Sequence, residues 1–304
     1  MPPGDRVTDN AAPRNHGSDV RLSVVIPMYQ ESARIGPTVR DVSRTIRDPA
    51  ASGLDGVRFV SVHLVDDGSG DGTARAARRA IERSGGGSVD GSVFDVVSHG
   101  TNRGKGAAVR TGLAAALNGS REPPHWILMM DADNAARLGE VGKLLGARGA
   151  SGSGPVDLVL GSRRVPDAEV DAALGRRLAG LLYVGLLRSL GLRLARDPQC
   201  GFKLYSARAA RVMLRYATED RFAFDIEHVL LCHRAGLRTA EVGIAWRHVE
   251  GGTVRPLRDG VSMLRAARRI ARRHRETRVS LAAPPAPPAA SAASVGGEAG
   301  VRGA

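Results

Sequence analysis

The sequence has few aromatic residues and few cysteines. Phe, Trp and Tyr make up 4% of the 304 residues, and no stretch interleaves them with basic residues as stacking platforms for single-stranded nucleic acid require. Two cysteines, Cys200 and Cys232, and no recognisable secretory signal argue against a disulfide framework or a Cys-rich metal site. We therefore expect no nucleic-acid partner and a reducing, cytoplasmic location.

Long apolar runs are also missing. The longest, Leu178 to Leu187, is about half of the roughly 20 residues that span a bilayer. The sequence thus predicts a protein that does not cross a membrane. The wider segment Leu174 to Leu194 is apolar on almost all sides of an expected helix, which suits the core, an oligomer contact or a lipid-facing element.

Basic residues are abundant: 44 Lys and Arg against 31 Asp and Glu give a net charge of +13. Such a charge attracts polyanions, including anionic lipid headgroups and phosphorylated substrates. Residues 1–20 are polar without apolar periodicity, and residues 279–304 are rich in Ala, Pro, Gly and Ser, so both are expected to be disordered tails. Between them we expect one domain, 21–254, followed by a basic amphipathic helix, 255–278.

Strand-like and helix-like segments alternate along the predicted domain. Apolar, β-branched runs predict strands, and apolar residues at helical spacing predict intervening helices. The expected strands are 22–26, 58–65, 93–98, 126–130, 157–160 and 240–246; the expected helices are 32–46, 73–83, 106–117, 174–194, 206–216 and 224–235. This order is typical of a mostly parallel, doubly wound α/β sheet, which binds ligands beyond the carboxyl ends of its strands.

Polar motifs follow the first two expected strands. VVIPMYQE (24–31) can hold a base and a ribose, or form an ordinary turn. HLVDDGSGDGT (63–73) joins two acids to glycines that let a nucleotide approach the backbone; the alternative is a solvated Asx turn. Both motifs favour a nucleotide site.

Two further motifs carry charged groups. In WILMMDADN (126–134), Asp131 and Asp133 can direct two carboxylates at one Mg²⁺ or Mn²⁺ that also binds a diphosphate, although either acid alone could cap a helix. NRGKGAAVRTG (102–112) lacks the Walker A pattern, which excludes a P-loop NTPase. Its Lys105 and Arg110 could meet phosphate or merely be solvated.

These four motifs, in this order and spacing, resemble the inverting family 2 glycosyltransferases. GSRR (161–164), DPQCGFKLY (197–205), RFAFDIEHVLL (221–231) and EVGIAW (241–246) resemble the dolichyl-phosphate β-glucosyltransferase branch. The resemblance covers roughly residues 22–275 and implies a single-domain GT-A (Rossmann-like) fold.

The resemblance also implies roles for individual residues. Donor binding falls to Pro27, Tyr29, Glu31, Asp66, Asp67, Asp131 and Ala132, and metal binding to Asp131 and Asp133. Arg163, Lys203 and Asp225 are the expected catalytic residues, with Arg163 meeting donor phosphates or acceptor. The acceptor side comprises Gln199, Gly201, Phe202, Glu227 and Arg255, with Glu227 facing the reaction centre.

The sequence departs from the family pattern twice. After the DAD triplet, the family has a small residue and then Ala-Thr, whereas Asn134, Ala135 and Ala136 follow here and the hydroxyl is lost. The family's Gly-Ser-Lys is Gly252-Thr253-Val254, so phosphate binding by this loop is in doubt unless Arg255 supplies the charge.

The predicted reaction is transfer of a hexose from a UDP-sugar to a polyprenyl (dolichyl) phosphate with inversion. Glucose is the first candidate for the hexose. A phosphate monoester is already anionic and needs little general base; an alcohol acceptor would need one, and Asp225 is the candidate, unless it is a structural acid at a helix start. The alternatives are GDP-mannose as donor, a small soluble phosphorylated acceptor such as phosphoglycerate, or a nucleotide sensor without turnover.

The C-terminal basic helix is expected to be amphipathic. Arg265, Arg268, Arg269, Arg272 and Arg273 fall on one side, and Met263, Leu264, Ala267, Ile270 and Ala271 on the other. The pattern suits an interfacial helix on an anionic membrane, and equally a surface helix packed on the core. The first interpretation predicts a peripheral enzyme at the inner face of the cell membrane.

Overall fold

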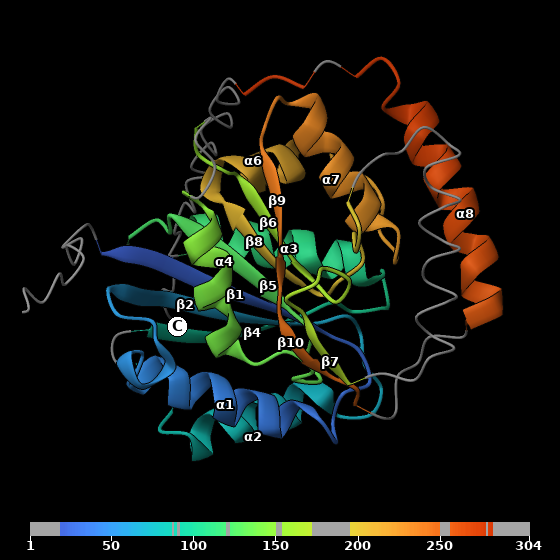
Figure 1. Cartoon of the computed structure of the whole chain (residues 1–304). Helices are drawn as coiled ribbons and strands as arrows, with labels where there is room; N and C mark the ends of the chain where they lie inside the picture. Colours follow the sequence, from blue (N-terminus) through green and yellow to red (C-terminus); the bar gives the residue numbers. More distant parts are fainter. Residues whose placement is uncertain are drawn as a thin grey trace, which may run out of the picture.

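The computed structural model describes residues 19–86, 88–89, 92–119, 122–149, 154–171, 195–249, 256–277 and 279–281. Within these ranges an eight-stranded sheet has the order β3-β4-β2-β1-β5-β8-β6-β9, and β10 and β7 pair separately (Figure 1). The strands are β1 (Val20–Met28), β2 (Val57–Asp66), β3 (Ser88–Val89), β4 (Ser92–Ser98), β5 (Trp126–Met130), β6 (Leu158–Ser162), β7 (Glu169–Asp171), β8 (Phe202–Ser206), β9 (Thr239–Gly243) and β10 (Ala245–Arg247).

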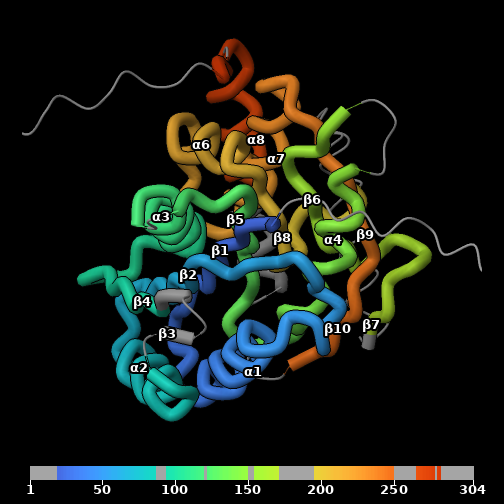
Figure 2. Tube along the Cα trace, turned by 90° about the vertical axis from the view of Figure 1, so that its left-hand side faces the viewer, coloured from blue at the N-terminus to red at the C-terminus, as the bar shows by residue number. Residues whose placement is uncertain are grey.

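Helices cover both faces of this sheet. The α-helices are α1 (Ile35–Arg47), α2 (Thr73–Arg83), α3 (Lys105–Asn118), α4 (Val141–Ala147), α6 (Ala207–Tyr216), α7 (Phe224–Arg234) and α8 (Pro256–Arg273), with short 3-10 turns at Ala50–Ser52 and Leu138–Glu140. Helices α1 and α2 lie on one side and α3, α6 and α7 on the other (Figure 2). The expected layered α/β architecture is confirmed.

Side chains alternate between two cores along the central strands, because successive residues of a strand point to opposite faces. From β1, Val24 and Ile26 join the core under α1, α2 and α4, whereas Val25 joins the core under α3, α6 and α7. All three side chains are fully buried. Burial on both faces explains the nearly continuous apolar runs in the sequence.

Strand direction sets the position of the site. Strands β4, β2, β1 and β5 are parallel neighbours, and Met28 at the end of β1 pairs with Asp66 at the end of β2. The loops that follow β1, β2 and β5 therefore leave the same edge of the sheet, carrying Tyr29, Asp67 and Asp131. Strand β8 runs antiparallel between β5 and β6, and the sequence did not predict it.

The predicted segments agree with most observed elements. Helix α2 and strand β5 have the predicted bounds, whereas α1 begins at Ile35 rather than at Ser32. The expected helix 174–194 lies outside the described residues, as do nearly all of both expected tails. No helix in the described ranges is long and apolar enough to cross a membrane.

Helix α8 packs on the protein through small apolar residues. Its Ala266, Ala267 and Ile270 are buried with Ile226 and Leu230 of α7. The side chains of Met263 and Leu264 lie outside the described part of the chain. Where its side chains are described, the apolar side of α8 thus faces the core, in agreement with a surface helix packed on the protein. These buried residues cannot insert into a lipid surface.

Candidate functional site

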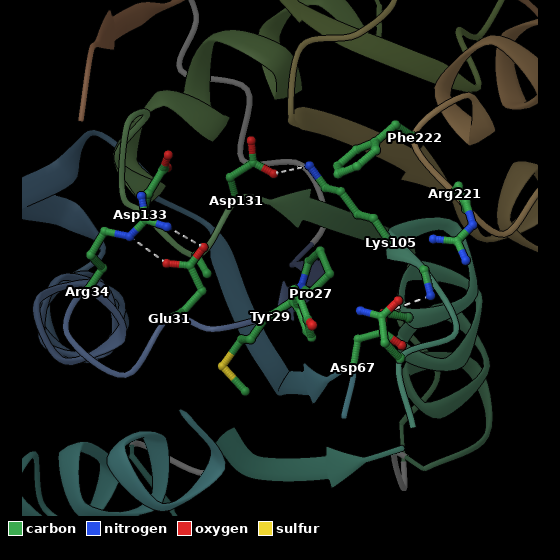
Figure 3. Close-up of a pocket in the computed structure, with 15 residues that line it drawn as sticks. Pro27, Tyr29, Glu31, Arg34, Asp67, Lys105, Asp131, Asp133, Arg221 and Phe222 are labelled. Carbon is green, nitrogen blue, oxygen red and sulfur yellow. Dashed lines mark hydrogen bonds and ion pairs between the residues drawn. The ribbon is translucent and has the colours of Figure 1, made fainter. Parts of the chain in front are cut away.

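A cavity of about 430 Å³ lies where β1, β2 and β5 end. Every residue expected to bind donor or metal lines it except Asp66, whose Oδ1 accepts a hydrogen bond from the Ser69 N–H at 3.3 Å. Figure 3 shows these side chains converging from separate loops. The residues brought together are Pro27, Tyr29, Glu31, Asp67, Asp131, Ala132 and Asp133.

Three carboxylates share one wall of this cavity. Burial, and then the charge of Asp131, raise the pKa of Asp133. Burial is also the main reason why the pKa of Glu31 is raised, and Asp133 and Asp131 add to it against an opposing ion pair with Arg34 at 2.7 Å. Carboxylates that repel one another in this way form a favourable place for a cation.

The carboxylate oxygens suit a hard divalent cation such as Mg²⁺ or Mn²⁺. No group of three His, Cys, Asp or Glu residues that could hold a metal occurs in the described ranges. A cation at Asp131 and Asp133 would therefore complete its coordination with water or with oxygens of a bound diphosphate. The donor set fits an ion that enters together with a ligand.

Lys105 places its ammonium against the Asp131 carboxylate. Its Nζ lies 2.6 Å from Oδ1 of Asp131, and the pair lies on the cavity wall (Figure 3). Gly104 and Gly106 flank it; a Cβ at Gly104 would collide with the backbone carbonyl of Asp220, and one at Gly106 with that of Glu219. The glycines of NRGKG thus let the 219–221 segment pack on the start of α3.

Arg110 has a different role from the one that its motif suggested. Its guanidinium donates to the Glu219 carbonyl at 2.9 Å and to the Asp220 carboxylate. Of the three basic residues in NRGKGAAVRTG, only Lys105 lines the cavity.

Asp67 organises the loop before Lys105. Its carboxylate accepts hydrogen bonds from the N–H groups of Arg103 at 2.9 Å and Gly104 at 2.7 Å, and it contacts Nδ1 of His99 at 2.8 Å. Nε2 of His99 contacts the Thr111 hydroxyl at 3.0 Å. Asp67 therefore fixes the 103–104 turn as well as lining the cavity.

Asn134 follows the two site acids with a φ of 57°. This left-handed conformation is costly for most residues but tolerable for Asn. Asn134 stands where the family has a small residue, and the left-handed backbone at this position is one that Asn can adopt. The next residue, Ala135, donates its N–H to Asp133 at 3.0 Å.

Strand β8 lies behind the acids. A Cβ at Gly201 would collide with both carboxylate oxygens of Asp131, so this glycine leaves room for the carboxylate. Phe202, expected on the acceptor side, is 1% exposed and belongs to the hydrophobic core, so any part it has at the site is through packing.

Lys203 and Asp225 form a buried ion pair of 2.5 Å. Lys203 is fully buried and also donates to the Cys200 carbonyl, and burial raises the pKa of Asp225 although Lys203 and Lys105 oppose it. Neither residue lines the cavity. The charges of Lys105 and Asp131 act on Asp225, so the two ion pairs are electrostatically coupled.

Glu227 does not face the cavity. Its fully buried carboxylate accepts hydrogen bonds from the Thr218 N–H, the Thr218 hydroxyl and the Glu219 N–H, and contacts His274. Both oxygens of Glu227 are thus occupied, and the side chain links α7 to the 218–219 segment and to His274 after α8. The geometry therefore departs from the expectation that it would face the reaction centre.

Arg163 is fixed by Asp197. Two guanidinium nitrogens donate to the Asp197 carboxylate at 2.8 and 3.0 Å, and the guanidinium lies 5.4 Å from the ring centre of Trp246. Trp246 lines a second cavity of about 650 Å³, which shares Asp133 with the first and is also lined by Arg137 and Arg247. Gln199 is half-buried, and Arg255 lies outside the described residues.

A comparison with protein families decides the classification. The model of glycosyl transferase family 2 matches residues 23–219. The chain belongs to this family. It is a glycosyltransferase, and the expected enzyme class is confirmed.

The similarity to individual named proteins covers more of the chain than the family match does. The glycosyltransferase is 32% identical to the human dolichyl-phosphate beta-glucosyltransferase, over 78% of its own length and 70% of the relative's. It is 26% identical to the protein of the same name from Dictyostelium discoideum, over 86% and 77%. It is also 27% identical to the one from Saccharomyces cerevisiae, over 85% and 76%.

Solved structures support the fold. Glucosyl-3-phosphoglycerate synthase from Mycobacterium tuberculosis, in complex with Mg²⁺ and uridine diphosphate, superposes with a TM-score of 0.55 at 21% identity, covering 84% of the glycosyltransferase and 79% of that chain. Mannosyl-3-phosphoglycerate synthase from Rubrobacter xylanophilus gives a TM-score of 0.53 at 19% identity, covering 84% and 74%. The expected GT-A fold is confirmed.

Sequence reasoning assigned no site role to several residues that line the cavity of the glycosyltransferase, among them Arg34, Asn102, Arg221 and Phe222. Asn102 and Arg221 begin motifs that the resemblance had already marked, which was the available signal. Phe222, which is 40% exposed at the cavity, follows Arg221 in the same motif, so the same signal applied to it.

Proposed function

We propose that this glycosyltransferase moves a hexose from a uridine diphosphate sugar to a polyprenyl phosphate with inversion. Glucose is the first candidate for the hexose. The observation that carries the proposal is the meeting of Asp131, Asp133 and Lys105 on one cavity wall beyond the ends of parallel strands. Nucleotides bind at this edge of doubly wound sheets. A diphosphate is the ligand group that both a carboxylate-bound cation and an ammonium can neutralise.

The proposed metal is Mg²⁺ or Mn²⁺, held by Asp131 and Asp133. When bound, such an ion would neutralise negative charge on the departing nucleotide diphosphate. The raised pKa of Asp133 supports this assignment, since it reflects burial beside a like charge. Gly201 and Lys105 orient the Asp131 carboxylate from two sides.

The proposed acceptor is the phosphate of a polyprenyl lipid. The relatives named dolichyl-phosphate beta-glucosyltransferase support this choice. The second cavity supports it as well, because it meets the donor cavity at Asp133 and places Arg137 and Arg247 where an anion could bind. Arg163, stacked on Trp246 beside this cavity, would add a further fixed charge.

No general base is needed for this acceptor. A phosphate monoester is already anionic near neutral pH, so the protein has to position it and exclude water. We therefore assign Asp225 a positioning role, in which it holds the fully buried Lys203 in an ion pair. The charges of Lys105 and Asp131 both influence Asp225, which places the two pairs in one electrostatic network.

We also propose that the enzyme meets its lipid at the cytoplasmic face of a membrane. The arginines of α8 support docking through charge, since Arg265, Arg268 and Arg272 are exposed. Because the apolar residues Ala266, Ala267 and Ile270 pack on α7, this docking would be electrostatic rather than insertive.

Incubation of purified protein with UDP-glucose, other UDP-sugars and GDP-mannose tests the function, with and without polyprenyl phosphate. Mass analysis of the lipid phase should show one hexose added from UDP-glucose, and the Asp133→Ala variant should give no product. A mannosyl lipid would replace the donor assignment with GDP-mannose. Turnover only with phosphoglycerate would contradict the lipid acceptor and favour the small soluble one.

A further inference from the structure

Lys105 occupies the position at Asp131 that a metal ion would need. The ammonium lies 2.6 Å from Oδ1 of Asp131, which is the contact distance of a charge-assisted hydrogen bond. Asp131 is also one of the two carboxylates to which the proposed function assigns the divalent cation. The same carboxylate therefore has two competing cationic partners.

The surroundings of Asp131 leave little freedom for its carboxylate to avoid this competition. Gly201 lies directly against the two carboxylate oxygens, with no room for a Cβ between them. On the cavity side the carboxylate faces Lys105 (Figure 3). A divalent cation must accordingly approach Asp131 from the side where the ammonium lies.

The backbone of Lys105 is fixed, but its ammonium is not. Gly104 has a φ of 110° and, like Gly106, contacts the 219–220 backbone closely, so the start of α3 cannot shift. The four-carbon side chain ends in a point charge without a rigid geometry. The ammonium can thus move from Asp131 to another anion in the cavity while α3 stays in place.

Lys105 leaves Asp131 as a cation. A lysine side chain is ordinarily an ammonium near neutral pH, and at 2.6 Å from Oδ1 of Asp131 it forms an ion pair with that carboxylate. A divalent cation bound to Asp131 alone would lie close to this positive charge, and their repulsion is strong in a partly buried site.

We propose that Lys105 is the counter-ion of Asp131 in the empty site and moves to the diphosphate when the donor enters, so that tight metal binding depends on the nucleotide. This inference rests on the proposed function only for the assignment of Asp131 as a metal ligand. The diphosphate brings the negative charge that allows the ammonium and the metal to be bound at the same time. Metal and donor are then taken up together.

Calorimetry of Mn²⁺ binding, with and without UDP, tests the proposal. In the wild type, UDP should tighten Mn²⁺ binding by at least about tenfold, because it draws Lys105 away from Asp131. In Lys105→Met, Mn²⁺ should bind about tenfold more tightly than in the wild type without UDP. The further effect of UDP should be correspondingly smaller, and Lys105→Arg, which keeps the charge, should behave like the wild type.

Lys143→Met is the matched control. Lys143 pairs with Glu140 at 2.9 Å and lines neither the donor cavity nor the second cavity. Its removal should therefore leave the Mn²⁺ affinity unchanged both with and without UDP. Thermal unfolding followed by circular dichroism checks that each variant is folded, and Lys105→Gln takes the place of Lys105→Met if the latter is not. Equal Mn²⁺ affinity of the folded charge-removing variant and the wild type without UDP would overturn the proposal.

Asp131→Asn separates this inference from the proposed function. Loss of Mn²⁺ binding in Asp131→Asn supports the ligand assignment, and the comparison of Lys105 variants then measures the competition directly. Retained Mn²⁺ affinity in Asp131→Asn would remove the metal ligand from the proposed function and the counter-ion role with it. Failure to glycosylate polyprenyl phosphate would contradict the acceptor alone, because Mn²⁺ and UDP binding do not involve it.

Discussion

Glu227 and His274 meet in the interior, where Oε1 of Glu227 lies 2.7 Å from Nε2 of His274 and neither residue is more than 2% exposed. The contact joins α7 to the residue that follows α8. The same carboxylate accepts the N–H groups of Thr218 and Glu219 at 2.9 and 2.7 Å. It therefore connects α8 to the segment that leads to Arg221 and Phe222 at the cavity.

We expect Glu227→Ala to lower the free energy of unfolding by roughly 3 kcal/mol, because several buried donors lose their acceptor together. Chemical denaturation followed by circular dichroism measures the change. Glu276→Ala is the control, since Glu276 is exposed near the same end of α8 and its loss should cost less than about 0.5 kcal/mol. Equal stability of both variants would show that Glu227 does not hold this side of the protein.

The same carboxylate predicts a pH dependence. Burial alone would raise its pKa, but hydrogen bonds from His274, Glu219 and Thr218 lower it from 4.5 to about 2. A pKa below the unfolded value contributes stability above about pH 4.5, which is lost as the pH falls towards 2. The stability advantage of the wild type over Glu227→Gln should therefore shrink by roughly 3 kcal/mol across this window. A constant difference in denaturation midpoints from pH 6 to 3 would contradict the assignment.

The role of Glu227 could not be read from the sequence, for a physical reason. Its partners lie 8, 9 and 47 residues away along the chain, and no local pattern records such a set. The periodic apolar segments were different, because strands buried on both faces and helices with one buried face leave a repeat in the sequence. Strand β8 was missed because Lys203 interrupts its apolar run, and Asp225 on α7 together with the Cys200 carbonyl makes that lysine acceptable in the core.

The candidate site was predictable where loops follow strands. Tyr29, Asp67, Asp131 and Asp133 come to one cavity because parallel strands end at one edge, which the order of elements implied. The closeness of Gly201 to Asp131 was not predictable, since it depends on β8 running antiparallel beside β5.

We expect Gly201→Ala to abolish metal-dependent turnover without unfolding the protein. The added Cβ collides with the Asp131 carboxylate rather than with backbone, so this side chain must turn away and lose its orientation. Mn²⁺ affinity in the presence of UDP should fall at least about tenfold, as expected when a carboxylate ligand is displaced. Calorimetry measures the affinity, and thermal unfolding reports the fold.

Gly146→Ala provides the comparison for Gly201→Ala. Gly146 lies in α4, and a Cβ there meets nothing within 4 Å, so Mn²⁺ affinity should stay unchanged and stability should rise by up to about 1 kcal/mol. Wild-type Mn²⁺ affinity in Gly201→Ala would mean that Asp131 is not held against β8 as described.

Asp67→Asn should weaken UDP binding. The carboxylate accepts two backbone N–H groups, from Arg103 and Gly104, whereas an amide offers only one oxygen and would turn its NH₂ group towards a donor. The loop that presents Lys105 then loses its geometry, and UDP affinity should fall roughly tenfold or more. Calorimetry with UDP measures this change.

Asp71→Asn is the matched variant for Asp67→Asn. Asp71 accepts the Thr73 N–H at 3.0 Å at the start of α2 and does not line the cavity, so UDP affinity should remain near that of the wild type. An unchanged dissociation constant for UDP in Asp67→Asn would place the nucleotide elsewhere.

The last prediction concerns binding of α8 to anionic membranes. Arg265, Arg268 and Arg272 are exposed and have no role at the 218–219 segment, unlike Arg269 and Arg273, which contact Glu219 and Thr218. Replacing these three arginines by Gln therefore removes charge from the surface without disturbing the contacts that lead to the cavity. Each basic residue near a negative surface contributes about 1 kcal/mol, so the triple variant should bind anionic vesicles roughly 100-fold more weakly.

Flotation with vesicles of phosphatidylcholine, alone or mixed with phosphatidylglycerol, measures this binding over a series of salt concentrations. The control replaces Arg75, Arg79 and Arg83 of α2 by Gln; these arginines are exposed and lie on the other side of the molecule from α8. Both triple variants lose the same net charge, so a non-specific attraction would weaken equally in both. Selective loss in the α8 variant, with wild-type binding that declines as salt screens the charges, supports docking through this helix. Equal losses, or no flotation of the wild type on anionic vesicles at low salt, would contradict it.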